Sequence, residues 1–139
     1  MAVEINNKTK SKINLELVKK TAEIFLKRFR KEKFDLSIAF VGDEEIKKIN
    51  KKYRGFNKPT DVLSFCGEGD FFGEIILNYG QIKKQTKEIL EVGDKAVEKE
   101  LIFILVHGLF HLLGYDDETE EDRLKMIRLG SEFIKSVKL

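Results

Sequence analysis

The two histidines of the chain, His107 and His111, stand four residues apart in the stretch HGLFHLLGYDD. On a helix, residues i and i+4 project from one face with Cβ atoms about 5–6 Å apart, so both imidazoles could bind one metal ion. Gly114 is a natural helix end, and the turn after it could return the carboxylate of Asp117 or Asp116 to that ion. Two imidazoles and one carboxylate would leave an open position for water, as catalytic zinc sites do.

Each of these residues also has a structural interpretation. A buried histidine often serves only in packing, and Asp117-x-x-Glu120 has the form of a capping box for a following helix. Two rings that titrate near neutrality are nevertheless poor choices for such an apolar helix unless something offsets their desolvation. A metal ion would do so. We therefore predict a site formed by His107, His111 and Asp117, with Asp116 as the alternative third ligand.

Gly108 argues against one familiar use of this motif. Metalloproteases of the HExxH type carry a general-base glutamate directly after the first histidine, and the glycine here takes that place. Peptide hydrolysis by that mechanism is therefore not expected. A glycine at this point also lets another backbone, or a substrate, approach the helix closely.

A second group of candidates is basic. Six cations occur within twelve residues, with Tyr53 and Phe56 interleaved as surfaces on which bases could stack. The cations are Lys47, Lys48, Lys51, Lys52, Arg54 and Lys58. This segment is either a path for RNA or an ordinary solvated helix surface, with Glu44 and Lys48 forming an i,i+4 pair.

Arg54 has the clearest chemical potential in that segment. A guanidinium binds phosphate oxygens through two donors, and near a metal it could stabilise the charge that develops when a phosphodiester is cleaved. Its alternative is a solvated surface arginine. Thr60 and Asp61 follow closely, and we interpret them as turn-capping residues rather than catalytic ones.

Composition indicates one domain that spans residues 1–139, with 42% apolar residues to form its core. The 26 basic and 24 acidic residues nearly cancel, so a nucleic acid would have to be met by a local patch. The apolar stretch 101–113 is shorter than the roughly 18 residues of a membrane span, and no membrane partner is expected. The first ten residues lack a signal-like apolar core, and the single Cys66 cannot form an internal disulfide. A cytoplasmic location is expected.

Apolar periodicity predicts an α+β fold in which about four strands, in a mixed sheet, pack with four or five helices. The helix at 95–113 contains six consecutive apolar residues, so it should be buried nearly all round and carry the histidines at its end. The last two strands are expected to form a hairpin. The predicted strands are 2–6, 34–40, 60–65 and 73–78, and the predicted helices are 15–29, 46–53, 79–90, 95–113 and 118–137.

Two stretches carry a family resemblance. HGLFHLLGYDD closely resembles the HGxLHLxGYDH signature of the YbeY family, bacterial endoribonucleases of ribosomal RNA maturation. Residues 50–65, NKKYRGFNKPTDVLSF, resemble the family segment N-x-x-[FY]-R-x-x-x-x-P-T-D-V-L-S-F, and GEIIL at 73–77 resembles its GDI strand. Their order and spacing also agree, so the likeness covers most of the chain and is weakest in the first forty residues.

This resemblance implies a zincin-like α+β fold with the metal at the end of the central helix. It implies that His107 and His111 are the first two metal ligands and that Arg54 belongs to the catalytic groove. Asp117 departs from the family, which has histidine there. Zinc is the first expectation for the ion. Because a carboxylate is a harder ligand than imidazole, manganese, iron or another divalent ion stays possible.

The function that follows is metal-dependent cleavage of single-stranded RNA in 3′ end maturation of small-subunit (16S-type) ribosomal RNA and in ribosome quality control. Arg54 and His107 are the predicted catalytic residues, and Lys51, Lys52, Arg54 and Lys58 the predicted RNA-binding residues. Ribosomal RNA and ribosomal particles are the expected partners, without DNA. The attacking group, water or the ribose 2′-hydroxyl, stays open.

Two other functions compete with this one. In the first, the protein is a non-catalytic, metal-stabilised ribosome-assembly factor that only binds RNA. In the second, the two histidines and the carboxylate form the facial triad of an iron-dependent oxygenase. The oxygenase is disfavoured because the remaining sequence offers no evident site for a cosubstrate.

Overall fold

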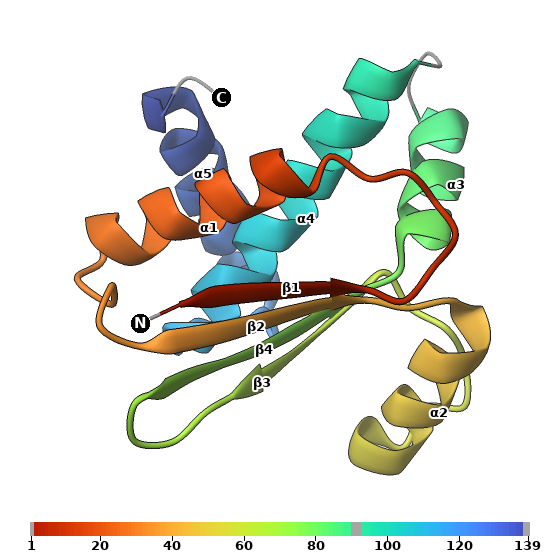
Figure 1. Cartoon of the computed structure of the whole chain (residues 1–139), viewed down its shortest axis with the longest axis horizontal. Helices are drawn as coiled ribbons and strands as arrows, with labels where there is room; N and C mark the ends of the chain where they lie inside the picture. The colour runs from red at the N-terminus through yellow and green to blue at the C-terminus, as the bar shows by residue number, and fades with distance from the viewer. Residues whose placement is uncertain (1, 90–92, 138–139) are drawn as a thin grey trace.

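The computed structural model describes residues 2–89 and 93–137, which form one four-stranded mixed sheet with helices on both faces (Figure 1). The strands, in spatial order, are β1 (Val3–Asn7), β2 (Asp35–Phe40), β4 (Phe71–Leu77) and β3 (Val62–Cys66). The first three are parallel to one another, and β3 pairs antiparallel with β4. The predicted four-stranded mixed sheet and its hairpin are therefore confirmed.

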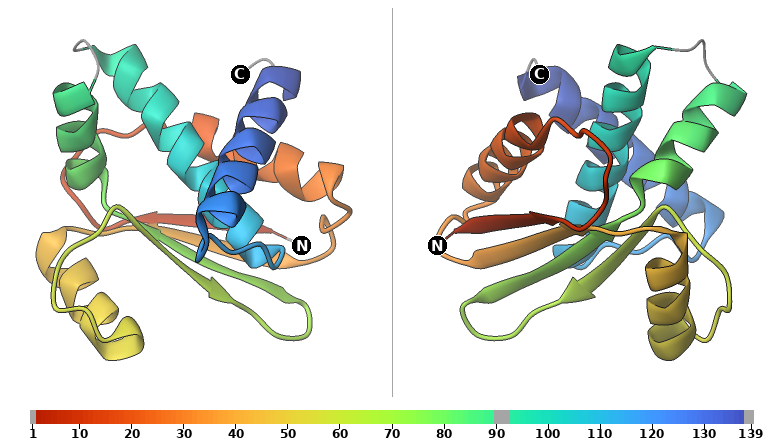
Figure 2. Two further views of the ribbon diagram at one scale, coloured as in Figure 1. Left: turned by 180° about the vertical axis from the view of Figure 1, so that it is seen from behind. Right: turned by 45° about the vertical axis from the view of Figure 1, so that its right-hand side comes forward.

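Five helices are present in the described residues, in agreement with the predicted α+β class. They are α1 (Leu15–Arg28), α2 (Asp43–Arg54), α3 (Tyr79–Ile89), α4 (Asp94–Leu112) and α5 (Glu120–Val137). Four of them, α1, α3, α4 and α5, lie on one side of the sheet, whereas α2 lies on the opposite side at one end (Figures 1 and 2). None of the described helices has the combination of length and apolar character that crossing a membrane requires.

Successive residues of β4 supply two separate cores because side chains alternate across a strand. Ile75 is fully buried in the large core beneath α4, whereas Ile76 packs on the other face with Ile46 of α2 and Leu63 of β3. Both faces of the sheet are therefore covered at this point, which explains why the last three residues of β4, 75–77, are all apolar.

Helix α4 crosses the middle of the sheet, and its ends fall within one residue of the predicted 95–113. Leu101, Leu105 and Leu109 are almost completely buried on its sheet side. Phe103, His107 and His111 are only partly buried. The helix is thus covered nearly all round, as predicted, and the partly open strip carries both histidines.

Candidate metal centre and cleft

The end of α4 is shaped by a hydrogen-bonded turn around Gly114. The N–H of Gly114 donates to the carbonyl of His111 (2.9 Å), and the N–H of Tyr115 donates to that of Phe110 (3.2 Å). Gly114 has φ +105°, and the rings of Phe110 and Tyr115 pack edge to face at 5.7 Å. These are the features of a Schellman C-cap, which reverses the chain within a few residues.

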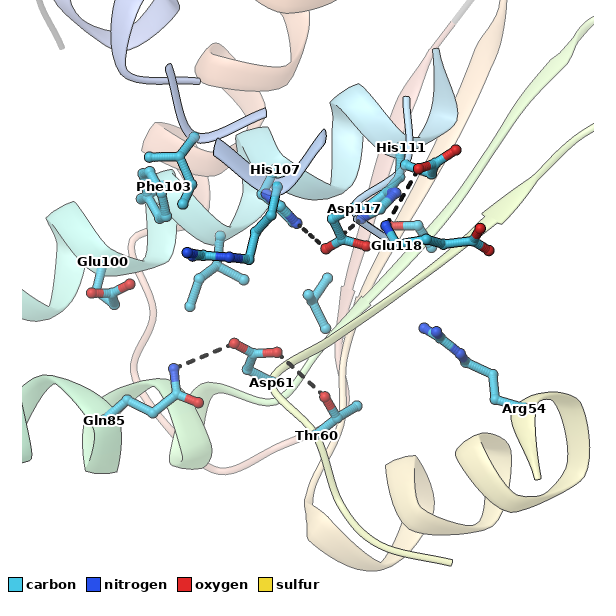
Figure 3. A pocket seen from close by; sticks show the side chains of 16 residues that line it. Arg54, Thr60, Asp61, Gln85, Glu100, Phe103, His107, His111, Asp117 and Glu118 are labelled. Carbon is cyan, nitrogen blue, oxygen red and sulfur yellow. Dashed lines mark hydrogen bonds and ion pairs between the residues drawn. The ribbon is translucent and has the colours of Figure 1, made fainter. Parts of the chain in front are cut away.

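The reversal returns Asp117 to the histidines. Its Oδ2 lies 3.2 Å from Nε2 of His107 and 3.6 Å from Nε2 of His111. One ligand atom from each of the three residues lies within 4.8 Å of the others. The predicted trio therefore converges on one point, and Figure 3 shows the three side chains turned toward each other.

Asp116 is occupied elsewhere. Its Oδ1 accepts a hydrogen bond from the N–H of Glu118 (3.3 Å), and it is not part of the convergent trio. The capping-box interpretation of Asp117 is wrong, because Thr119 caps α5 by accepting from the N–H of Asp122 (3.0 Å). Asp117 is thus left free to face the imidazoles.

The protonation of the histidines suits metal binding. Nδ1 of His111 lies 2.9 Å from the carbonyl of Tyr115; since a carbonyl only accepts, Nδ1 carries the hydrogen and Nε2 has the free lone pair. Burial, with the neighbouring His111, lowers the pKa of His107 against the opposing effect of Asp117. A neutral imidazole is the form that binds a metal.

The trio fits a divalent ion by its chemistry as well as by its convergence. Two imidazole nitrogens and one carboxylate oxygen form a donor set that zinc, iron and manganese each accept. All three residues line an open cleft of about 650 Å³, so solvent and a substrate can reach the position they surround. These residues are therefore capable of holding one ion on the wall of the cleft.

Arg54 lines the same cleft from another element. It is the last residue of α2, and it faces the histidines from across the cleft (Figure 3). The chain turns immediately afterwards at Gly55, whose φ of +79° is the left-handed conformation typical of a helix C-cap. Within the described residues, no carboxylate pairs with the Arg54 guanidinium. Its donors are available to a phosphate.

The other predicted RNA-binding residues form an exposed surface at the end of α2. Lys51, Lys52 and Lys58 are all exposed. Tyr53 and Phe56 are 61% and 52% exposed, which is high for aromatic rings. Lys52 lies over the Tyr53 ring at 5.2 Å, and Lys58 lies over the Phe56 ring at 5.6 Å. We call these five residues the α2 surface; it combines cations with stacking planes.

Gly108 proves to serve packing against the sheet. A Cβ added there would lie 3.0 Å from Oγ of Ser64 and 3.4 Å from Cδ1 of Ile75. The Ser64 hydroxyl also donates to the Gly108 carbonyl (3.3 Å). The close approach expected of this glycine is therefore made by β3 and β4.

Two acidic residues of the cleft were not predicted as functional. Glu100 lies on α4 seven residues before His107, and Asp61 lies just before β3; both line the cleft. The side chain of Asp61 accepts from Gln85 of α3 (3.3 Å). One sequence signal pointed to Glu100, which is its place on the histidine face of α4. Nothing local in the sequence indicated that Asp61 and Gln85 would line the same cleft.

Comparison with known proteins identifies the family. The family model described as Endoribonuclease YbeY matches residues 4–138. The chain belongs to the YbeY family. An Endoribonuclease YbeY of Acetivibrio thermocellus is 36% identical, with 90% of this chain and 87% of the relative covered. That of Clostridium botulinum is 33% identical, with 96% of each covered.

A solved structure supports the same conclusion for the fold. The solution structure of TM1509 from Thermotoga maritima superposes with a TM-score of 0.63 at 28% identity, covering 98% of this chain and 91% of that one. The resemblance drawn from the two sequence stretches is thus confirmed over nearly the whole chain. Membership in YbeY places the chain in an endoribonuclease family.

Proposed function

We propose that this protein is a metal-dependent endoribonuclease that cuts single-stranded RNA. The observation that carries the proposal is that the His107–His111–Asp117 group and Arg54 line one cleft, in a chain that the Endoribonuclease YbeY model matches over residues 4–138. The ligands come from α4 and the turn after it, and the arginine comes from α2. A phosphate in the cleft would lie between them.

His107, His111 and Asp117 are the residues that would hold the ion, with zinc as the first candidate. A bound divalent ion supplies Lewis-acid polarisation of a phosphoryl oxygen and lowers the proton affinity of an attacking water. Asp117 adds a negative charge that a third histidine would not, and this charge favours harder ions than an all-imidazole site does. Manganese and iron are therefore the other candidates.

Arg54 is proposed to bind and orient the phosphate. Its planar donors match two phosphate oxygens, and a guanidinium stabilises the extra negative charge of the transition state. The positive charge of Arg54 also offsets the negative charges of Asp61, Glu100 and Asp117, which line the same cleft. Without this cation, the metal-free cleft would repel a polyanion.

The α2 surface is proposed to guide the RNA strand toward Arg54. Exposed Tyr53 and Phe56 can stack on bases only where the bases are unpaired, so the surface favours single-stranded over double-stranded RNA. Lys51, Lys52 and Lys58 would contact backbone phosphates without selecting a sequence. Cleavage should therefore depend more on strand accessibility than on base identity.

The substrate we propose is the 3′ end of small-subunit ribosomal RNA within an assembling ribosomal particle, with a further role in ribosome quality control. The support for this step is the YbeY resemblance. The cleft is open to solvent, so a flexible RNA tail could enter it. DNA is not proposed as a substrate.

The test combines metal analysis with RNA cleavage. Wild-type protein and His111→Ala are purified, their metal content is measured, and each is incubated with an end-labelled single-stranded RNA, the same RNA as a duplex, and the matching DNA. Wild type loaded with zinc, manganese or ferrous ion should cut the single strand, and a chelator should abolish cutting. His111→Ala should lose both metal and cleavage.

One result would overturn the catalytic part of the proposal, and the product ends would identify the attacking group. Protein that binds RNA but never cuts it with any of the three ions would support the non-catalytic assembly factor instead. Products that end in a 2′,3′-cyclic phosphate would identify the 2′-hydroxyl as the attacking group, whereas a linear terminal phosphate formed without a cyclic intermediate would identify water.

A further inference from the structure

The cleft contains a pair of carboxylates that belongs to neither the metal ligands nor the α2 surface. Glu100 lies seven residues before His107, about two helical turns away on the same face of α4. Asp61 enters from the loop before β3, and all three residues line the cleft. In Figure 3, Glu100 and Arg54 lie on opposite sides of the metal ligands. Asp61 lies across from the ligands, between Glu100 and Arg54 (Figure 3), so a strand whose phosphate is held between the ligands and Arg54 would run past Asp61 toward Glu100.

Asp61 is held in place as a hydrogen-bond acceptor. Its Oδ1 accepts from the hydroxyl of Thr60 (3.4 Å), and its Oδ2 accepts from the side-chain amide of Gln85 (3.3 Å). Its own backbone carbonyl accepts from the N–H of Asn78 (2.9 Å), which anchors the loop to the end of β4. A carboxylate oriented by donors on both oxygens is placed to accept a proton from a group in the cleft.

Glu100 has the opposite surroundings. It is half-buried on α4, and none of the described residues donates a hydrogen bond to its carboxylate. Desolvation, together with the charge of Asp61, raises the pKa of Glu100. A carboxyl group whose burial favours its protonated form, beside a carboxylate held as a hydrogen-bond acceptor, is the usual arrangement of an acid and a base in one site.

The charged neighbours of the pair do not reverse the raised pKa of Glu100. The other titratable or charged residues that line the cleft are His107 and His111 of α4, Asp116, Asp117 and Glu118 of the turn after it, Arg54 of α2 and Arg123 of α5. Arg123 is occupied by Glu120, whose carboxylate accepts from its Nε at 3.0 Å and its Nη2 at 2.6 Å. No cation is among the groups that shift the pKa of Glu100.

We propose that Asp61 and Glu100 form the proton-transfer pair of RNA cleavage, with Asp61 as the base and Glu100 as the acid. This inference rests on the proposed endoribonuclease function. Asp61 takes the proton of the attacking oxygen as its bond to phosphorus forms. Glu100 gives its proton to the 5′-oxygen as the bond from phosphorus to that oxygen breaks. One proton then passes from Asp61 to Glu100, directly or through water, and restores the pair.

The decisive test uses a substrate whose leaving group needs no proton. The variants are Glu100→Gln and Asp61→Asn, with Glu98→Gln as the matched control, because Glu98 is a partly buried glutamate of the same helix that lines a different groove. Each metal-loaded protein is given an ordinary RNA and the same RNA with sulfur replacing the 5′-oxygen at the cleaved bond. Metal content and circular dichroism of each variant are measured first.

The expected results separate an acid from a structural residue. Glu100→Gln should lower kcat on ordinary RNA by roughly 10²- to 10⁴-fold, and the sulfur substrate should recover most of that loss. Wild type should also show an alkaline limb in its kcat/KM profile, and Glu100→Gln should lack it. Asp61→Asn should stay slow on both substrates. Glu98→Gln should behave as wild type.

A second measurement does not depend on activity. In ¹³C-labelled, metal-free protein, the carboxyl resonance missing from Glu100→Gln should titrate at higher pH than the other glutamates. Equal losses for Glu100→Gln on both substrates, or a Glu100 resonance that titrates with the rest, would overturn the inference while wild-type cleavage upholds the proposed function. Wild type that cuts neither substrate would overturn both.

Discussion

Nδ1 of His111 donates to the backbone carbonyl of Tyr115 across 2.9 Å and so joins the last turn of α4 to the loop that follows it. This bond fixes which nitrogen faces the cleft, because a hydrogen on Nδ1 leaves Nε2 as the free donor atom. In ¹⁵N-edited spectra of neutral, metal-free protein, His111 should be the Nδ1–H tautomer. The Nε2–H tautomer in this state would contradict the assignment.

Removal of Asp117 should release the metal while the fold persists. Asp117→Ala takes away one of three ligands but leaves the cap of α5, which Thr119 supplies. We expect affinity for zinc or manganese to fall by at least about 100-fold. Asp116→Ala is the matched control and should retain stoichiometric metal. Elemental analysis after dialysis checks both variants, and a metal-replete Asp117→Ala protein would move the third ligand elsewhere.

Asp117→His should change which metal is preferred. The substitution replaces a charged oxygen donor by an imidazole, which zinc accepts well and manganese accepts less readily. The ratio of zinc to manganese affinity should therefore rise relative to wild type. Competition titrations with a zinc-sensitive dye measure this ratio. An unchanged ratio would show that Asp117 does not contact the ion.

Gly114→Ala should destabilise the protein by about 1–2 kcal/mol, because a side chain is strained in the left-handed region. Gly114 has φ +105°, and a Cβ added there would meet no other atom within 4 Å, so the expected effect comes from backbone conformation rather than from a clash. Gly80→Ala is the control, since Gly80 lies within α3 without a left-handed φ, and a Cβ there would make an ordinary contact with Oδ1 of Asn78 at 3.5 Å. Urea denaturation measures both variants, and equal stabilities would refute the argument.

Arg54→Ala should reduce RNA cleavage by roughly 10²-fold or more without changing metal content, because a lost charge-stabilising donor affects the transition state. Arg54→Lys should recover only part of this activity, since an ammonium lacks the planar pair of donors. Lys47→Ala, on the same helix, controls for the loss of one positive charge. Activity of Arg54→Ala equal to that control would make the arginine a surface residue.

The metal-free fold should lose stability as the pH falls below about 6.5, the ordinary value for histidine. Burial lowers the pKa of His107 in the folded protein, so the unfolded chain binds the proton more readily and is favoured as the pH drops. The loss should continue until the lowered folded-state pKa is passed. Urea denaturation between pH 8 and 5 measures the slope.

His107→Gln isolates this contribution. The raised pKa of Glu100 acts in the opposite direction, because the folded protein then holds that proton more readily and gains stability as the pH falls. Wild type and His107→Gln both contain Glu100. The difference between them in the slope of unfolding free energy against pH is therefore the contribution of His107. Identical slopes would show that His107 does not contribute to the pH dependence.

Local patterns predicted most of the secondary structure. Periodicity predicted α4 to within one residue at each end. The structural alternative for Asp117, a capping box for α5, is not formed, because Thr119 caps that helix instead. Sequence spacing could not show that the turn after Gly114 directs Asp117 toward the histidines and leaves Thr119 to cap.

Features whose geometry depends on near neighbours along the chain could be predicted from local patterns. His107 and His111 share a face because a helix repeats every 3.6 residues, and Gly114 ends that helix because its backbone can enter the left-handed region. Long-range packing was needed to show that Asp117 meets both rings and that Arg54, Asp61 and Glu100 share their cleft. These residues come from separate elements, and packing of α2, α3 and α4 on the two faces of the sheet brings them together.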